Sequence, residues 1–98
     1  MPAAYFSWGL ALARHGDLTG AIAKYAAANA RGPHWADPLK AWGDALSAQG
    51  RWAEAEAKYA EADQYAPKWK QLHYAWGEAL RREGKYSAAI AQYHLVRG

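Results

Sequence analysis

Residues 38–67 have the sequence PLKAWGDALSAQGRWAEAEAKYAEADQYAP, and the pattern inside this segment decides the fold. Its tryptophan–glycine pair, Trp42-Gly43, occurs 34 residues earlier as Trp8-Gly9 and 34 residues later as Trp76-Gly77. Other alanine, leucine, glycine and tyrosine positions recur at the same spacing. Self-similarity at one fixed period of about 20–50 residues is typical of repeat architectures. The sequence therefore predicts a single array of three units, near residues 2–35, 36–69 and 70–98, with the last unit truncated and without a capping helix.

Each unit is predicted to contain two helices. In the middle unit Asp37 precedes Pro38, which favours a helix start, because an acceptor caps the first turn and a proline there loses no hydrogen bond. Gly50 is expected to end this helix in the left-handed conformation, and Pro67 closes the unit. The same scheme predicts six helices, near residues 3–15, 19–31, 37–49, 53–65, 70–83 and 87–97.

Small residues recur inside the first helix of each unit. A glycine in mid-helix costs about 1 kcal/mol relative to alanine, so its repeated use predicts a close contact with another helix. The expected partner is the recurring alanine of the second helix, which is Ala21, Ala55 or Ala89. The large side chains are then expected to fill the space between successive units: Trp8, Trp42, Trp76, Tyr25, Tyr59 and Tyr93.

The pattern resembles the tetratricopeptide repeat over essentially the whole chain. In the middle unit the family's positions are matched in order by Trp42, Gly43, Leu46, Gly50, Ala55, Tyr59, Ala62 and Pro67. There are departures, because the position where the family usually has tryptophan holds Tyr5, Leu39 and His73. The resemblance implies an all-α fold, a right-handed α-solenoid of three helix-turn-helix repeats with six helices, whose first helices line a concave groove.

The resemblance also implies a protein–protein interaction scaffold, which receives a peptide or a helix of a partner in the groove, and no enzyme. Carried over position by position, the groove residues are Phe6, Leu10, Arg14, Lys40, Asp44, Tyr74, Glu78, Arg81 and Arg82. Aromatic and arginine side chains are common anchors of binding interfaces, so we expect a ligand with an apolar anchor and some acidic character. One subgroup of the family grips the C-terminal carboxylate of heat-shock chaperones with lysine and asparagine. The only asparagine here is Asn29, on a second helix, which argues against that ligand.

An alternative is a structural or self-associating repeat unit with no ligand of its own, either a fragment of a longer array or a designed repeat protein. We expect Ile90, Leu95 and Val96 to be partly exposed at the end of the array. Apolar patches of this kind favour association. End-to-end stacking into a homo-oligomer is therefore a second hypothesis.

Several side-chain groups could suggest other chemistry. The four histidines, His15, His34, His73 and His94, are all more than five residues apart, so we predict neither a metal site nor a cofactor, and a packed role for His73. The acidic residues of the second unit are expected to form a solvated face: Glu54, Glu56, Glu61 and Asp63. Trp35 and Trp69 lie at turns between units, where packing is the expected role, and a place at the rim of the groove is the alternative.

Composition narrows the classes of partner. The net charge is +3, but no basic cluster exceeds Arg81-Arg82, which argues against a nucleic-acid binder. No apolar run approaches the roughly 20 residues that span a bilayer, so we expect no membrane partner. There is no cysteine, and the first residues lack the pattern of a signal peptide, which favours a cytoplasmic location.

Overall fold

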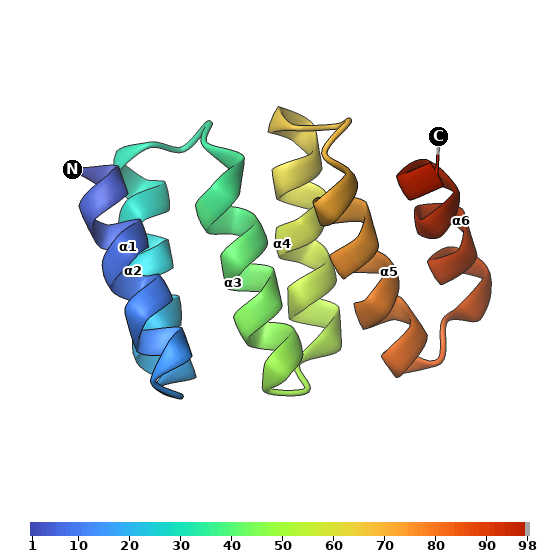
Figure 1. The fold of residues 1–98 in the computed structure, drawn as a ribbon, viewed down its shortest axis with the longest axis horizontal. Coiled ribbons are helices and arrows are strands. Elements are labelled where there is room, and N and C mark those ends of the chain that lie inside the picture. Colours follow the sequence, from blue (N-terminus) through green and yellow to red (C-terminus); the bar gives the residue numbers. More distant parts are fainter. Residues whose placement is uncertain (98) are drawn as a thin grey trace.

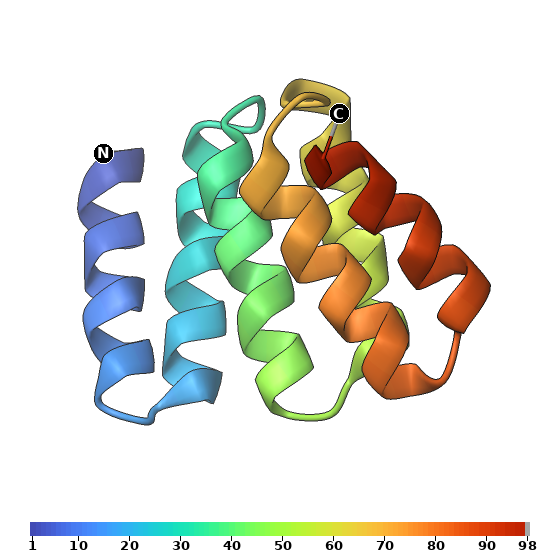
Figure 2. The same ribbon diagram turned by 45° about the vertical axis from the view of Figure 1, so that its right-hand side comes forward.

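The computed structural model describes residues 1–97, which form three antiparallel helix hairpins stacked side by side in chain order (Figures 1 and 2). The helices are α1 (Pro2–Arg14), α2 (Leu18–Arg31), α3 (Ala36–Ala48), α4 (Trp52–Tyr65), α5 (Lys70–Glu83) and α6 (Tyr86–Arg97). These bounds lie within one residue of the predicted ranges. The prediction of an all-α, right-handed solenoid of three helix-turn-helix repeats is confirmed.

The turns inside the hairpins follow the predicted chemistry, but one helix start does not. Gly50 has a φ of 75° and takes the left-handed conformation in which the amide of Arg51 bonds the Leu46 carbonyl at 2.9 Å. Asp37 was expected to cap α3, and this is wrong. Trp35 occupies the cap position without a side-chain bond, and Asp37 lies in the first turn. The proline after it is still tolerated, because the amides of the first turn have no partner within the helix.

Within each hairpin the mid-helix glycine faces a tyrosine ring. A Cβ added to Gly43 would lie 2.6 Å from Cε1 of Tyr59, and the same 2.6 Å separates the corresponding atoms at Gly77 and Tyr93. The close helix contact is therefore as predicted, but the nearest partner is the tyrosine, not the alanine of the second helix. The tyrosines consequently pack inside their own hairpin, not only between hairpins.

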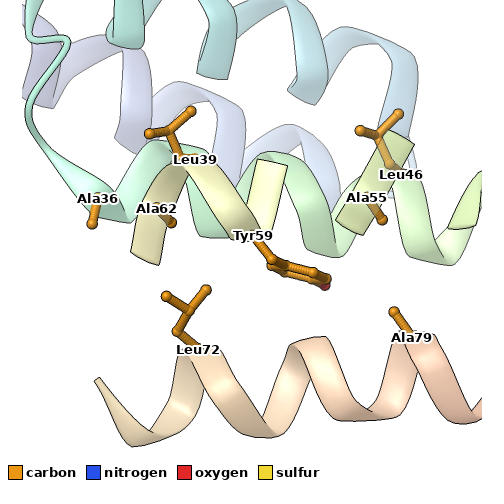
Figure 3. Packing of buried hydrophobic residues seen from close by; sticks show 8 residues of the cluster. All are labelled: Ala36, Leu39, Leu46, Ala55, Tyr59, Ala62, Leu72 and Ala79. Atoms are coloured by element: carbon orange, nitrogen blue, oxygen red, sulfur yellow. The ribbon is translucent and has the colours of Figure 1, made fainter. Parts of the chain in front are cut away.

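The main core lies between the second hairpin and the third. It is built from buried side chains of α3, α4 and α5, shown in Figure 3: Ala36, Leu39, Leu46, Ala55, Tyr59, Ala62, Leu72 and Ala79. Trp42 packs against this cluster and against a second one around Ala21, Tyr25 and Ala45, so it fills space between hairpins as predicted. Trp8 does not, because it is 52% exposed, and its ring contacts Lys24 of its own hairpin.

The two tryptophans at the turns between hairpins and one histidine are packed as predicted. Trp35 packs edge-to-face on Phe6, with 5.0 Å between ring centroids, and Trp69 packs against the main core, so both fill space between hairpins. His73 is buried as predicted, and its Nε2–H donates to the Pro67 carbonyl at 2.7 Å. Its Nδ1 lies 2.8 Å from Oε1 of Gln92 on α6.

The acidic face of α4 is only partly solvated. Glu54 is exposed and paired with Arg51, whereas the side chain of Glu56 is only 18% exposed. Lys85 Nζ lies 3.4 Å from Glu56 Oε1 and 3.2 Å from Glu83 Oε2. The prediction of a wholly solvated face is therefore wrong for Glu56, which belongs to an ionic contact between the second and third hairpins.

Candidate functional site

A concave pocket of about 710 Å³ lies between α3 and α5, which are neighbours on one face of the molecule (Figure 2). We call it the α3–α5 pocket. Five of the nine predicted groove residues line it: Lys40, Asp44, Tyr74, Glu78 and Arg82. The remaining lining residues are Ser47, Ala48, Tyr59, Lys70, Gln71, Ala75 and Val96. The repeat places these side chains together because equivalent positions of successive first helices face the same side.

The two carboxylates of the pocket are held by neighbouring side chains. Asp44 accepts a hydrogen bond of 2.6 Å from the Tyr59 hydroxyl and pairs with Lys40 Nζ at 2.8 Å. At the equivalent position of the third hairpin, Glu78 accepts from the Tyr93 hydroxyl at 2.5 Å and pairs with Arg81. Each carboxylate therefore already has a hydroxyl donor and a cation as partners inside the protein.

The pKa values of these groups follow from the same contacts. Burial, together with the Asp44 carboxylate, raises the pKa of the Tyr59 hydroxyl far above its ordinary value. The hydrogen bond from Arg81, with that from Tyr93, lowers the pKa of the Glu78 carboxyl. Tyr59 is thus a neutral donor and Glu78 a charged acceptor at neutral pH, which fixes the tyrosine–carboxylate pair in each of these two hairpins.

Two cations of the pocket have no such partner. Lys70 and Arg82 line it, and neither makes an ion pair within residues 1–97, although the charge of Arg82 helps to lower the pKa of the Glu78 carboxyl. They stand at the start of α5 and in its last turn. Because the pocket carboxylates are already paired, the charge that the pocket offers to a ligand is positive.

An apolar patch lies between these two cations. The Tyr74 side chain is 54% exposed and leans on Tyr93, with 6.1 Å between ring centroids. Ala75 beside it and Val96 from α6 complete the apolar part of the lining. The pocket therefore combines one exposed aromatic surface with two flanking positive charges.

The other four predicted groove residues lie outside the pocket. Phe6 was expected to form an apolar end of the groove, but it is half-buried between Trp35 and Tyr25 in the second cluster. Leu10 and Arg14 are exposed on α1, where no preceding hairpin faces them in the described residues. Arg81 points its guanidinium at Glu78 and does not line the pocket.

Lys70 and Val96 are two of the lining residues that lie outside the nine predicted groove positions. Lys70 could have been found, because it lies one helical turn before Tyr74 and shares its face. Val96 was missed because the groove prediction used first helices alone, whereas the antiparallel packing of α6 on α5 brings the end of α6 beside the start of α5.

No group of three or more acidic or histidine side chains that could hold a metal ion occurs within residues 1–97. Along the same stretch of chain, none of the helices combines the length and the apolar character needed to cross a bilayer.

Known proteins resemble this chain in structure. Neither a protein-family model nor a curated protein sequence matches it. The second tetratricopeptide repeat domain of Spaghetti (RPAP3), solved with the HSP90 peptide SRMEEVD, superposes with a TM-score of 0.93 at 19% identity, over 97% of this chain and 88% of that one. The type III secretion translocator chaperone SycD of Yersinia enterocolitica matches with a TM-score of 0.93 at 17% identity, over 97% and 72% of the two chains.

MamA gives a TM-score of 0.92 at 20% identity, with 97% of this chain covered. The chain spans about half of MamA, 52% of its length. At identities of this order the likeness concerns the backbone architecture alone. Together with the 34-residue period and the three stacked hairpins, it shows that the chain has the fold of a tetratricopeptide repeat domain.

Proposed function

We propose that the chain is a protein-interaction module whose α3–α5 pocket holds an extended peptide, with acidic residues on both sides of an apolar one. The proposal rests on two cations, Lys70 and Arg82, which make no ion pair within residues 1–97 and flank the exposed Tyr74. Acidic ligand groups can pair with both cations, because Asp44 and Glu78 are held by tyrosine hydroxyls and by other cations, Lys40 and Arg81.

The spacing of the cations suggests the length of the ligand. Lys70 and Arg82 are twelve residues apart on α5, which corresponds to about 18 Å along a helix. An extended peptide advances about 3.3 Å per residue, so five or six residues cover this distance. The expected recognition sequence therefore has two acidic residues about five positions apart, with an apolar or aromatic residue between them.

Two further observations support this proposal. The solved RPAP3 domain of the same fold is bound to the peptide SRMEEVD, which shows that such a fold can hold a short acidic segment. This chain has a single asparagine, Asn29 on α2, away from the pocket lining. The proposed ligand is therefore read through internal acidic side chains, without a clamp for a C-terminal carboxylate.

The test begins with a displayed library of random octapeptides selected on the 98-residue chain. The most frequent sequence is then synthesised with a fluorescein label, and its Kd is measured by anisotropy. Arg82→Ala should weaken binding about three- to fivefold, as expected for a partly solvated ion pair worth up to about 1 kcal/mol. Raising the salt concentration should also weaken binding, because exposed charges are screened.

Arg14→Ala is the matched control, because Arg14 occupies the same repeat position as Arg82 but lies outside the pocket. It should leave the Kd unchanged. Selected peptides without acidic residues, or equal effects of the two arginine variants, would contradict the proposed ligand and its place.

A further inference from the structure

The two interfaces between hairpins are built from the same repeat positions. Leu18 of α2 and Trp52 of α4 are equivalent, and each packs against a core cluster that spans two hairpins. The helix that follows contributes an equivalent tryptophan and alanine in each case. These are Trp42 and Ala45 in α3, and Trp76 and Ala79 in α5. One interface is thus used twice within the chain.

The two outer helices of the described residues 1–97 carry the two halves of this interface, and within this range no further hairpin covers either half (Figure 1). On α6, Tyr86 has the position of Leu18 and is 65% exposed, and Ile90 has the position of Ile22 and is 55% exposed. On α1, Trp8 has the position of Trp42, and Ala11 has the position of Ala45. Ala11 is exposed, whereas Ala45 is 4% exposed.

We infer that a second copy of this chain docks its α1 on the exposed face of α6 and so repeats the α2–α3 interface between molecules. In that arrangement Tyr86 and Ile90 of one copy cover Trp8 and Ala11 of the next. The occupant is a second copy because the complementary half of the interface is present on the same chain, position for position: Trp8, Ala11 and Ile90 match Trp42, Ala45 and Ile22, and Tyr86 replaces Leu18.

The α2–α3 interface is the better template for this contact than the α4–α5 interface. The α2–α3 interface has the apolar Ile22 at the position of Ile90. The α4–α5 interface has Glu56 there, which is paired with Lys85. In the docked pair, Asp17 of the second copy would take the place that Lys85 has beside Glu56. The Asp17 side chain caps α2 by accepting from the Gly20 amide. Ile90 is apolar and needs no charged partner, so Asp17 can remain at the edge of the contact.

The contact joins two different surfaces, so it is heterologous, and it continues the side-by-side stacking of hairpins along the array instead of closing a two-fold pair. Repeated copies form open head-to-tail chains, whose length grows with protein concentration. This property separates the proposed contact from a two-fold dimer, in which the same surface is used by both partners and growth stops at two copies.

The test uses two variants that each block one end. Ile90→Glu places a charge on the docking face of α6, and Ala11→Glu does the same on α1; both sites are exposed, so the isolated fold is retained. Sedimentation velocity from micromolar to millimolar concentration should show the unmodified chain growing beyond two copies. Each variant alone should remain monomeric, and an equimolar mixture should reach twice the monomer mass and stop there.

Ala23→Glu is the control, because Ala23 and its equivalents Ala57 and Ala91 are all exposed and lie outside the interfaces. It should associate like the unmodified chain. A strictly monomeric unmodified chain, a variant that still dimerises alone, or a mixture that remains monomeric would each overturn the inference.

Discussion

At the level of single residues, the contact between Gly43 and Tyr59 sets how closely α3 approaches α4. Tyr59 is 1% exposed and its hydroxyl is bonded to Asp44, so the ring cannot move aside easily. Gly43→Ala would gain about 1 kcal/mol of helix propensity but would place its Cβ 2.6 Å from the ring. Overpacking of this kind costs about 1–3 kcal/mol. We expect the free energy of unfolding in urea to fall by about 1 kcal/mol.

Gly77→Ala is the natural comparison, because its Cβ would meet Tyr93 at the same 2.6 Å. Tyr93 is only half-buried and lies on the outer helix α6, so it can yield. The loss of stability should therefore be smaller than for Gly43→Ala. If Gly43→Ala were as stable as the unmodified chain, the tyrosine contact would not be the reason for glycine at this position.

The same pair shows what could be predicted from the sequence and what could not. The recurrence of glycine in mid-helix predicted a close contact, because a residue with a helical cost must be offset by packing. The partner was not predictable, since Ala55 and Tyr59 share one face of α4 and only the crossing of the helices decides which is nearer. Phe6 illustrates the same limit, because a position assigned to the groove is covered by Trp35.

Among the helices, α4 meets the turn between α5 and α6 through coupled charges, because Lys85 in that turn contacts Glu56 of α4 and Glu83 of α5. Burial raises the pKa of the Glu56 carboxyl, and the hydrogen bond with Glu56 lowers the pKa of Glu83. Lys85 opposes the rise at Glu56 and supports the fall at Glu83. In Lys85→Met the two carboxylates repel each other at pH 7, so we expect a lower Tm than for the unmodified chain, measured by circular dichroism.

The sign of the pH dependence follows from the two pKa shifts. A carboxyl with a raised pKa in the folded state stabilises below that pKa, and its contribution is lost as the pH rises through it. A carboxyl with a lowered pKa in the folded state stabilises the protein at pH values above its ordinary pKa, and this stabilisation is lost as the pH falls through the lowered pKa. Without Lys85 the pKa of Glu56 rises further and the pKa of Glu83 falls less. Both changes lower the free energy of unfolding more at pH 7 than at pH 5, so the Tm deficit of Lys85→Met should be smaller at pH 5.

Arg51→Met is the matched control, because Arg51 has the position of Lys85 in the preceding interface. Within residues 1–97 its only carboxylate partner is the exposed Glu54, and exposed pairs contribute little. Arg51→Met should therefore lower the Tm much less than Lys85→Met does. A Tm deficit of Lys85→Met that is equal at both pH values would mean that the carboxylates do not interact.

For the molecule as a whole, stability should be graded along the array, because each hairpin contacts only its neighbours and the middle one has two. Among the residues described, α1 and α6 each have one buried residue, Gly9 and Ala89, whereas α3 has six. We expect amide hydrogen exchange at micromolar concentration to be slowest in α3 and α4 and fastest in the outer helices, because the outer helices open without exposing the core.

Protein concentration then separates this gradient from the proposed stacking of copies. Docking of α1 on α6 would cover both outer helices, so their exchange should slow as the concentration rises, while the exchange of α3 stays the same. Ile90→Glu should abolish the concentration dependence and leave the gradient itself in place. Equal protection of all six helices at micromolar concentration would contradict the gradient, since it would mean that the three hairpins open together as one cooperative unit despite their unequal burial.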